Sequence, residues 1–421
     1  MDGGWMAGLT INVMVLGERG SGKTLYLAGL YRQLSYDSIK SVVTLSPNNV
    51  HTRILDRLYE EVTSVEDGHF PEPTGWGVDI WSFECSVFAG DGERIRAFSI
   101  FDINYADYAG EMLDGGGLDA QELGENQVIK RFDEAVERAD VFIVLIDGHR
   151  LLRLMRGEPR WEPWLDNYLR ARLATMTKVA RKRHTWRPVQ FVITKWDIFE
   201  DEFSFEDVRS KILAQPSLHD FLEGRRESGG APIRLIPVSV TGRFARLDEE
   251  GVMVKVPTEA IRPLNLDIPF AAVLPDQIRA ARQEAAQRAA GDTGNGLAEN
   301  KITDRIRWFE RVRRGSDTAR APLLNLVGRY FDNRGATPRG KANASAALEQ
   351  AFQWLDQLAE RRQQAAEYEL SELRRIHRAR QARIESHNAA LCLAIESFDA
   401  RLREFEKAFP GSFLLERKFT E

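Results

Sequence analysis

The sequence feature that most constrains the fold is a glycine-rich segment near the N-terminus that joins an apolar run to a helix-like run. The segment is Gly17-Glu-Arg-Gly-Ser-Gly-Lys-Thr24. Residues 11–16 before it are mostly aliphatic, which favours a buried strand, and residues 25–34 after it favour a helix. Because the segment matches G-x-x-x-x-G-K-[ST] between a strand and a helix, the sequence predicts a phosphate-binding loop (P-loop).

The chemistry of this loop follows from its residue types. Glycines let backbone N–H groups close around a β-phosphate, and the helix that follows adds the positive end of its dipole. Lys23 is expected to bridge the β- and γ-phosphates, and the Thr24 hydroxyl is expected to bind Mg²⁺. The residues predicted to contact the nucleotide here are Gly17, Gly20, Ser21, Gly22, Lys23, Thr24 and Leu25.

The first 290 residues alternate short runs rich in Val, Ile and Phe with helix-like segments. This pattern is typical of an α/β fold with a mostly parallel sheet and helices on both faces. The expected strands are residues 11–16, 79–88, 95–102, 141–147, 189–194 and 233–238. The turn-rich residues 89–92 favour a hairpin between the second and third of these, so one antiparallel strand is expected.

The composition changes after residue 290. We expect a nucleotide-binding domain over residues 1–290, with a helical insertion near residues 48–65, a glycine-rich linker at 291–300 and an all-α module at 301–421. Residues 341–409 contain no Gly or Pro and favour long helices, arranged as a hairpin or a coiled coil. An apolar stripe near their end predicts packing against the first domain or a partner helix. Its residues are Leu391, Ile395, Phe398, Leu402, Phe405 and Phe409.

A second motif, Thr194-Lys-Trp-Asp197, follows the predicted strand at residues 189–194. It resembles the [NT]-K-x-D motif with which small-GTPase-like proteins recognise guanine. The Asp197 carboxylate can accept hydrogen bonds from the ring N–H and exocyclic amine of guanine, whereas adenine offers no matching pair of donors. The Lys195 side chain would pack over the base. The alternative is that Asp197 only caps a helix.

A third segment, Val238-Ser-Val-Thr-Gly242, follows the next predicted strand. In the same families a Ser-Ala-x motif at this place contacts the base. Ser239 fits that motif, and Val240 departs from the usual Ala.

The metal and hydrolysis residues are expected between these motifs. Asp102 ends the predicted strand 95–102, as a carboxylate that holds Mg²⁺ through water does. Asp107-Tyr-Ala-Gly-Glu111 resembles the D-x-x-G motif of GTPases, and Asp107 is the alternative metal-proximal carboxylate. We favour Asp102, with Gly110 and Glu111 as the γ-phosphate switch. Glu111 either polarises water or is a solvated surface residue.

The first switch of such proteins requires a Thr that caps Mg²⁺ and the γ-phosphate. Thr74 lies five residues before the predicted strand 79–88 and is the candidate for this role. The alternatives lie in or near the helix-like insertion and are Thr44, Thr52 and Thr63. An ordinary turn residue is the alternative reading of Thr74.

Together these motifs make residues 9–275 resemble the translation-factor-related (Ras-like) class of P-loop GTPases. The long insertion, the Gly110-Glu111 pair and residues 263–269 are also similar to bacterial double-GTPase proteins of conflict and defence systems. The resemblance implies GTP or GDP and Mg²⁺ as ligands and slow hydrolysis of GTP. It also implies signalling to a protein partner, either a second GTPase or an effector, through the C-terminal helices. A dynamin-like assembling GTPase and a non-hydrolysing GTP-binding protein are the competing functions.

Charge and composition limit the other partners. The chain has 58 Lys and Arg against 63 Asp and Glu, and this net charge of −5 gives no reason to expect nucleic acid or an anionic membrane. Its two cysteines are Cys85 and Cys392, which are too far apart in the sequence for a disulfide framework or a metal cluster. Without an apolar run of ~18 residues, no integral membrane association is expected. We therefore expect a cytoplasmic protein, and the long helices leave homodimerisation open.

Overall fold

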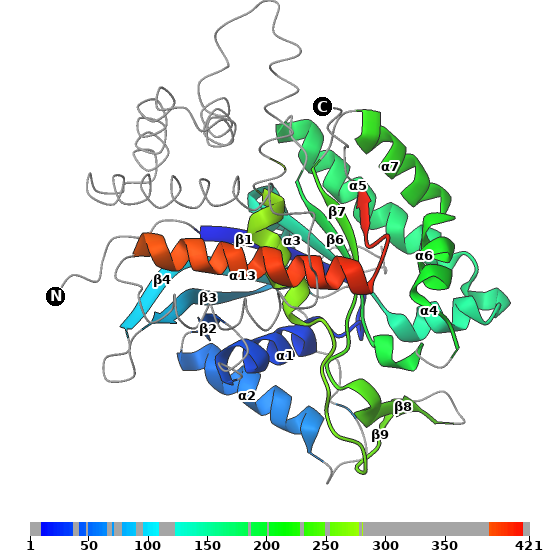
Figure 1. The fold of residues 1–421 in the computed structure, drawn as a ribbon. Coiled ribbons are helices and arrows are strands. Elements are labelled where there is room, and N and C mark those ends of the chain that lie inside the picture. The colour runs from blue at the N-terminus through cyan, green and yellow to red at the C-terminus, as the bar shows by residue number, and fades with distance from the viewer. Residues whose placement is uncertain are drawn as a thin grey trace, which may run out of the picture.

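The computed structural model describes residues 10–36, 42–47, 49–64, 70, 78–89, 96–108, 123–183, 187–199, 202–227, 231–248, 253–277, 280 and 387–415. These residues form an eight-stranded sheet with helices on both faces (Figure 1). The expected α/β fold class with a mostly parallel sheet is confirmed.

The sheet has the strand order β10-β7-β6-β5-β1-β4-β3-β2. Its strands are β1 (Thr10–Gly17), β2 (Val43–Pro47), β3 (Val78–Ala89), β4 (Arg96–Tyr108), β5 (Val141–Ile146), β6 (Val189–Ile193), β7 (Ile233–Pro237) and β10 (Phe413–Leu415). β4, β1, β5, β6 and β7 are parallel, and β3 is antiparallel to β4 as the hairpin prediction required. The expectation of one antiparallel strand is incomplete, because β10 also runs antiparallel to its neighbour β7.

Helices cover the two faces of the sheet and enclose two apolar cores. The first face carries α1 (Lys23–Tyr36), α13 (His387–Ala408) and the helical residues 267–277, with α2 (Asn49–Thr63) packed on α1. The second face carries α3 (Leu123–Arg138), α4 (Gly148–Met155), α5 (Trp164–Arg183), α6 (Phe205–Leu213) and α7 (Pro216–Glu227). A separate hairpin joins β8 (Ala245–Leu247) to β9 (Met253–Lys255). α2 lies within the segment 48–65 that the sequence predicts as helical.

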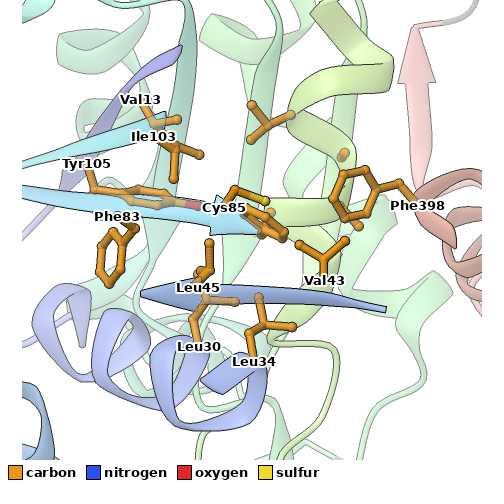
Figure 2. Close-up of a cluster of buried hydrophobic side chains, with 14 of the residues drawn as sticks. Val13, Leu30, Leu34, Val43, Leu45, Phe83, Cys85, Ile103, Tyr105 and Phe398 are labelled. Atoms are coloured by element: carbon orange, nitrogen blue, oxygen red, sulfur yellow. The ribbon is translucent and has the colours of Figure 1, made fainter. Parts of the chain in front are cut away.

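The core under α1 forms because alternate residues of each strand point to the same face. Figure 2 shows Phe83 and Cys85 of β3 in this core together with Ile103 and Tyr105 of β4. Phe398 of α13 reaches the same cluster, although it follows these strands by almost 300 residues. The core therefore combines residues from both ends of the chain.

The C-terminal segment 387–415 is part of the sheet domain, which corrects the expected boundary at residue 301. Four members of the predicted apolar stripe are buried in the core, namely Ile395, Phe398, Leu402 and Phe405. β10 then adds the edge strand beside β7. The stripe therefore packs against the first domain, one of the two predicted arrangements. Residues 291–386, with the predicted linker and most of the predicted helical module, lie outside the described residues.

Two sets of ion pairs, one buried and one partly exposed, hold this segment against the domain. Arg234 of β7 donates to both carboxylate oxygens of Asp276 at 2.7 and 2.9 Å and to Glu406 of α13 at 2.6 Å. Arg234 and Asp276 are fully buried. Arg401 of α13 donates to both oxygens of Asp267 at 2.6 and 3.1 Å. Charged hydrogen bonds with such geometry fix the position of α13 on the sheet.

Within the part of the chain that the structure describes, no helix combines the length and the hydropathy needed to span a bilayer.

Candidate nucleotide-binding site

The glycine-rich loop has the strand–loop–helix setting that its sequence predicts. β1 ends at Gly17 and α1 begins at Lys23, and all seven residues predicted to contact the nucleotide lie at this junction. Gly20 and Gly22 have φ angles of 79° and 86°, in the left-handed region that glycine adopts without a steric penalty. Lys23 Nζ donates to the carbonyl oxygens of Gly17 and Glu18, at 3.0 Å each. The lysine side chain therefore folds over the loop.

Thr24 meets a carboxylate from another strand. Its Oγ1 donates to Oδ2 of Asp107 at 2.9 Å, and both residues are buried. β4 is parallel to β1 with Asp107 beside Val15, so Asp107 lies at the carboxyl edge of the sheet near the loop. A hydroxyl and a carboxylate are the oxygen donors that Mg²⁺ prefers, and phosphates and water complete such sites. The described residues hold no group of three or more His, Cys, Asp or Glu arranged for a metal. The donor set thus fits a Mg²⁺ that is shared with a nucleotide.

The preference for Asp102 as the metal-proximal carboxylate is not supported by its position. The preference for Asp102 depended on a strand that ends at residue 102, but β4 continues to Tyr108. Asp102 pairs in register with Thr10, at the start of β1, five residues before Asp107. At ~3.3 Å per strand residue, this places it ~16 Å from Asp107 along the strand, away from the loop. Burial, and then the neighbouring Glu84 carboxylate, raise the pKa of Asp102.

The predicted guanine motif lies beside the same loop. Lys195 has a left-handed backbone with φ of 55°, and its Nζ donates to the Gly20 carbonyl at 3.1 Å. The same Nζ donates to Asp147 Oδ1 at 2.9 Å. Thr194 N donates to the Ile146 carbonyl at 3.0 Å, which holds the start of the motif against the end of β5. Lys195 therefore joins the second motif to the phosphate loop.

Asp197 and Ser239 form one cluster. The Ser239 hydroxyl donates to the Asp197 carboxylate and accepts a hydrogen bond from Gly242 N at 2.8 Å. Lys195 is the residue that precedes the short 3₁₀ turn Trp196–Ile198, and Asp197 lies inside that turn. The capping alternative for Asp197 is therefore wrong. Val240 contacts α1, where a Cβ added at Gly29 would lie 3.0 Å from a Val240 methyl group.

Asp147 is a site residue that sequence reasoning missed. It caps α4 by accepting a hydrogen bond from His149 N at 3.0 Å, and it also holds Lys195. Burial lowers the pKa of His149, and the Asp147 carboxylate opposes that shift. The signal was available, because Asp147 ends a predicted parallel strand and the carboxyl ends of such strands form ligand sites.

Thr74, Gly110 and Glu111 lie outside the described residues. Their roles at the γ-phosphate stay predictions.

Comparisons with known proteins give distant structural matches. No family model and no curated protein matches the chain. A signal recognition particle receptor SRb-GTP/SRX complex from Chaetomium thermophilum aligns over 56% of this chain and 93% of that chain, with 13% identity and a TM-score of 0.30. GDP-bound Roco2 of Methanosarcina barkeri aligns over 57% and 46%, with 14% identity and a TM-score of 0.22.

A third match is Era in complex with MgGDPNP and a 16S ribosomal RNA segment. It aligns over 72% of this chain and 67% of that chain, with 13% identity and a TM-score of 0.27. Scores this low carry no argument about ligand or activity, so the assignment of the site depends on its own geometry.

Proposed function

We propose that the protein is a guanine-nucleotide switch that binds GTP or GDP with Mg²⁺ and hydrolyses GTP slowly to GDP and phosphate. The observation that carries this proposal is the contact between Lys195 and Gly20. It joins a loop suited to phosphates and a motif suited to guanine in one site. The Ser239–Asp197 hydrogen bond adds support, because it orients the carboxylate that would recognise the base.

Each side chain then has a defined task. The N–H groups of the loop and Lys23 would hold the phosphates, and Asp197 would accept the two donors of guanine. Thr24 and Asp107 would hold Mg²⁺, which when bound neutralises charge on the phosphates. In hydrolysis water attacks the γ-phosphorus, and the bond to the β–γ bridging oxygen breaks.

The rate is expected to be low. Glu111, the proposed water-orienting residue, carries a negative charge that opposes the γ-phosphate. Unassisted GTPases hydrolyse GTP at ~10⁻⁴ to 10⁻² s⁻¹, and we expect a rate in this range.

The proposed output is a protein partner, a second GTPase or an effector, that contacts the predicted helices of residues 301–386. The apolar stripe of α13 is already buried against the sheet, so the partner would use the residues before it. A role in bacterial defence is the biological setting that the sequence resemblance suggests.

A nucleotide titration tests the proposal. Nucleotide-free protein is titrated with labelled GTP, GDP and ATP in Mg²⁺, and phosphate release is followed over a tenfold range of protein concentration. The expected result is guanine-selective binding with slow, concentration-independent release. Preference for ATP would contradict the guanine assignment, and release that rises with concentration would favour the assembling GTPase. Tight GTP binding without release would favour the non-hydrolysing alternative.

A further inference from the structure

The side chain of Glu18, the second residue of the phosphate loop, is held by the second face of the sheet. The residue is only 8% exposed. Arg150 Nη1 of α4 donates to its carboxylate at 2.5 Å, and Trp164 Nε1 of α5 donates to both oxygens at 3.0 and 3.1 Å. A buried carboxylate requires such charged and directional partners.

The backbone of the same residue holds the interior of the loop. The Glu18 carbonyl accepts hydrogen bonds from Lys23 Nζ at 3.0 Å, from Ser21 Oγ at 2.8 Å and from Ser21 N at 3.2 Å. A displacement of Glu18 would therefore displace Lys23, the side chain expected to bind the phosphates. Glu18 connects that lysine to α4 and α5.

Arg150 is placed to influence both halves of the site. Its Nε lies 4.0 Å from Asp147 Oδ2, and Asp147 holds Lys195. Its guanidinium also lies 5.8 Å from the ring centroid of Trp161. A single side chain of α4 thus pairs with the carboxylate of Glu18, whose backbone carbonyl holds Lys23, and lies near the carboxylate of Asp147, which holds Lys195.

We propose that Arg150 and Trp164 form a latch on Glu18, and that this latch sets the rate at which the site releases its nucleotide. The inference rests on the proposed function and adds a control of nucleotide release to it. Arg150, Trp164 and Glu18 act as positioning residues, because the side chains of all three act through the loop backbone. Weakening the latch frees the loop to open, which speeds dissociation more than it slows association.

Dissociation of a fluorescent GDP analogue tests the latch. Full-length protein is loaded with N-methylanthraniloyl-GDP in Mg²⁺ and chased with excess GDP, using direct excitation of the analogue. Loss of a hydrogen bond to a buried charge predicts release about tenfold faster in Arg150→Ala and Glu18→Gln, with a smaller increase in Trp164→Phe. The association rate is expected to stay within about twofold of wild type in all three variants.

Arg156→Ala is the matched control. Arg156 is the residue directly after α4, the helix that carries Arg150. Its Nε lies 2.9 Å from Oε2 of Glu202, and both side chains are about two-fifths exposed. Among the described residues, the Arg156 side chain pairs with Glu202 and forms no hydrogen bond or ion pair with the loop, so its removal is expected to leave release unchanged. The double variant Glu18→Gln/Arg150→Ala is expected to release GDP no faster than the faster single variant, because both remove the same contact.

The outcomes separate the latch from the proposed function. A wild-type protein that binds no GDP would overturn both. Normal GDP binding with unchanged release in all three variants would overturn the latch alone. Equal acceleration in Arg156→Ala, or multiplicative effects in the double variant, would show a general loss of stability and also reject it. If Arg150→Ala does not fold, Arg150→Lys and Trp164→Phe provide the same test. Arg150→Lys keeps the charge but not the guanidinium geometry, so it is expected to release GDP faster than wild type by less than about tenfold.

Discussion

Thr24 and Asp107 are 83 residues apart in the sequence, and the Thr24 hydroxyl donates a hydrogen bond of 2.9 Å to the Asp107 carboxylate. The parallel pairing of β1 and β4 brings the loop after β1 to the last residues of β4. Asp102 also belongs to β4, but it pairs with Thr10 at the other end of β1. One strand therefore offers two carboxylates, of which one lies at the proposed metal site and the other does not.

We expect Asp107→Asn to weaken Mg²⁺-dependent GDP binding by about tenfold or more, because it removes charge next to the proposed metal position. Asp102→Asn is the matched control and is expected to bind GDP as the wild type does. Titrations of GDP in Mg²⁺ and in EDTA measure both. A loss of affinity that persists in EDTA, or an equal loss in Asp102→Asn, would contradict the assignment of Asp107.

Asp197→Asn is expected to lower GDP affinity by at least ~100-fold and to favour xanthine nucleotides. The amide replaces one acceptor by a donor, which matches the carbonyl of xanthine instead of the amine of guanine. Competition titrations with GDP and XDP measure the change. Unchanged GDP affinity would show that Asp197 does not recognise the guanine base.

Ser239→Ala is expected to lower GDP affinity less than Asp197→Asn does. It removes the hydrogen bond that orients Asp197 but keeps the carboxylate, so a loss of only about threefold to tenfold is expected. A loss as large as that in Asp197→Asn would mean that the serine contacts the nucleotide directly.

The sequence predicted the elements that depend on local patterns. The strand–loop–helix unit around residues 17–24, the turn at residues 194–197 after β6 and six of the eight sheet strands lie where those patterns place them. The end of β4 was predictable in principle, since Phe101, Ile103 and Tyr105 alternate with polar residues and point into one core. The sequence pattern predicts a strand end at Asp102, whereas this residue lies on a half-exposed face in the middle of β4.

The sequence did not predict the contacts between segments that are far apart in the chain. The spacing of Phe398 and Leu402 marks a helix with one apolar face, but it does not say which surface covers that face. The pairing of β10 with β7 joins segments about 180 residues apart, and the link from Arg150 to Glu18 joins a helix to a loop 132 residues earlier. Such contacts follow from the assembled fold and carry no signature in the chain.

Asp102 also predicts a dependence of stability on pH. Its raised pKa means that the folded state disfavours its charge, through burial first and the opposite Glu84 second. The charged form therefore lowers stability at neutral pH, and this cost disappears as pH falls through the raised pKa toward the ordinary value of 3.8. We expect Asp102→Asn to raise the melting temperature at pH 7 and to have little effect below pH ~3.8. Thermal unfolding at several pH values measures the difference, and a stabilisation that does not change with pH would contradict the electrostatic cause.

Arg234→Ala is expected to destabilise the fold by about 3–5 kcal/mol, because it leaves the buried Asp276 carboxylate without its bidentate partner. Denaturant unfolding measures the change. The double variant Arg234→Met/Asp276→Leu removes both charges and is expected to lose less stability than Arg234→Ala alone. Arg401→Ala is a control for the same helix, and its smaller expected loss follows from the partial exposure of the Arg401–Asp267 pair. If Arg234→Ala cost no more than Arg401→Ala, the buried pair would not be what fastens β7 to residues 267–277 and α13.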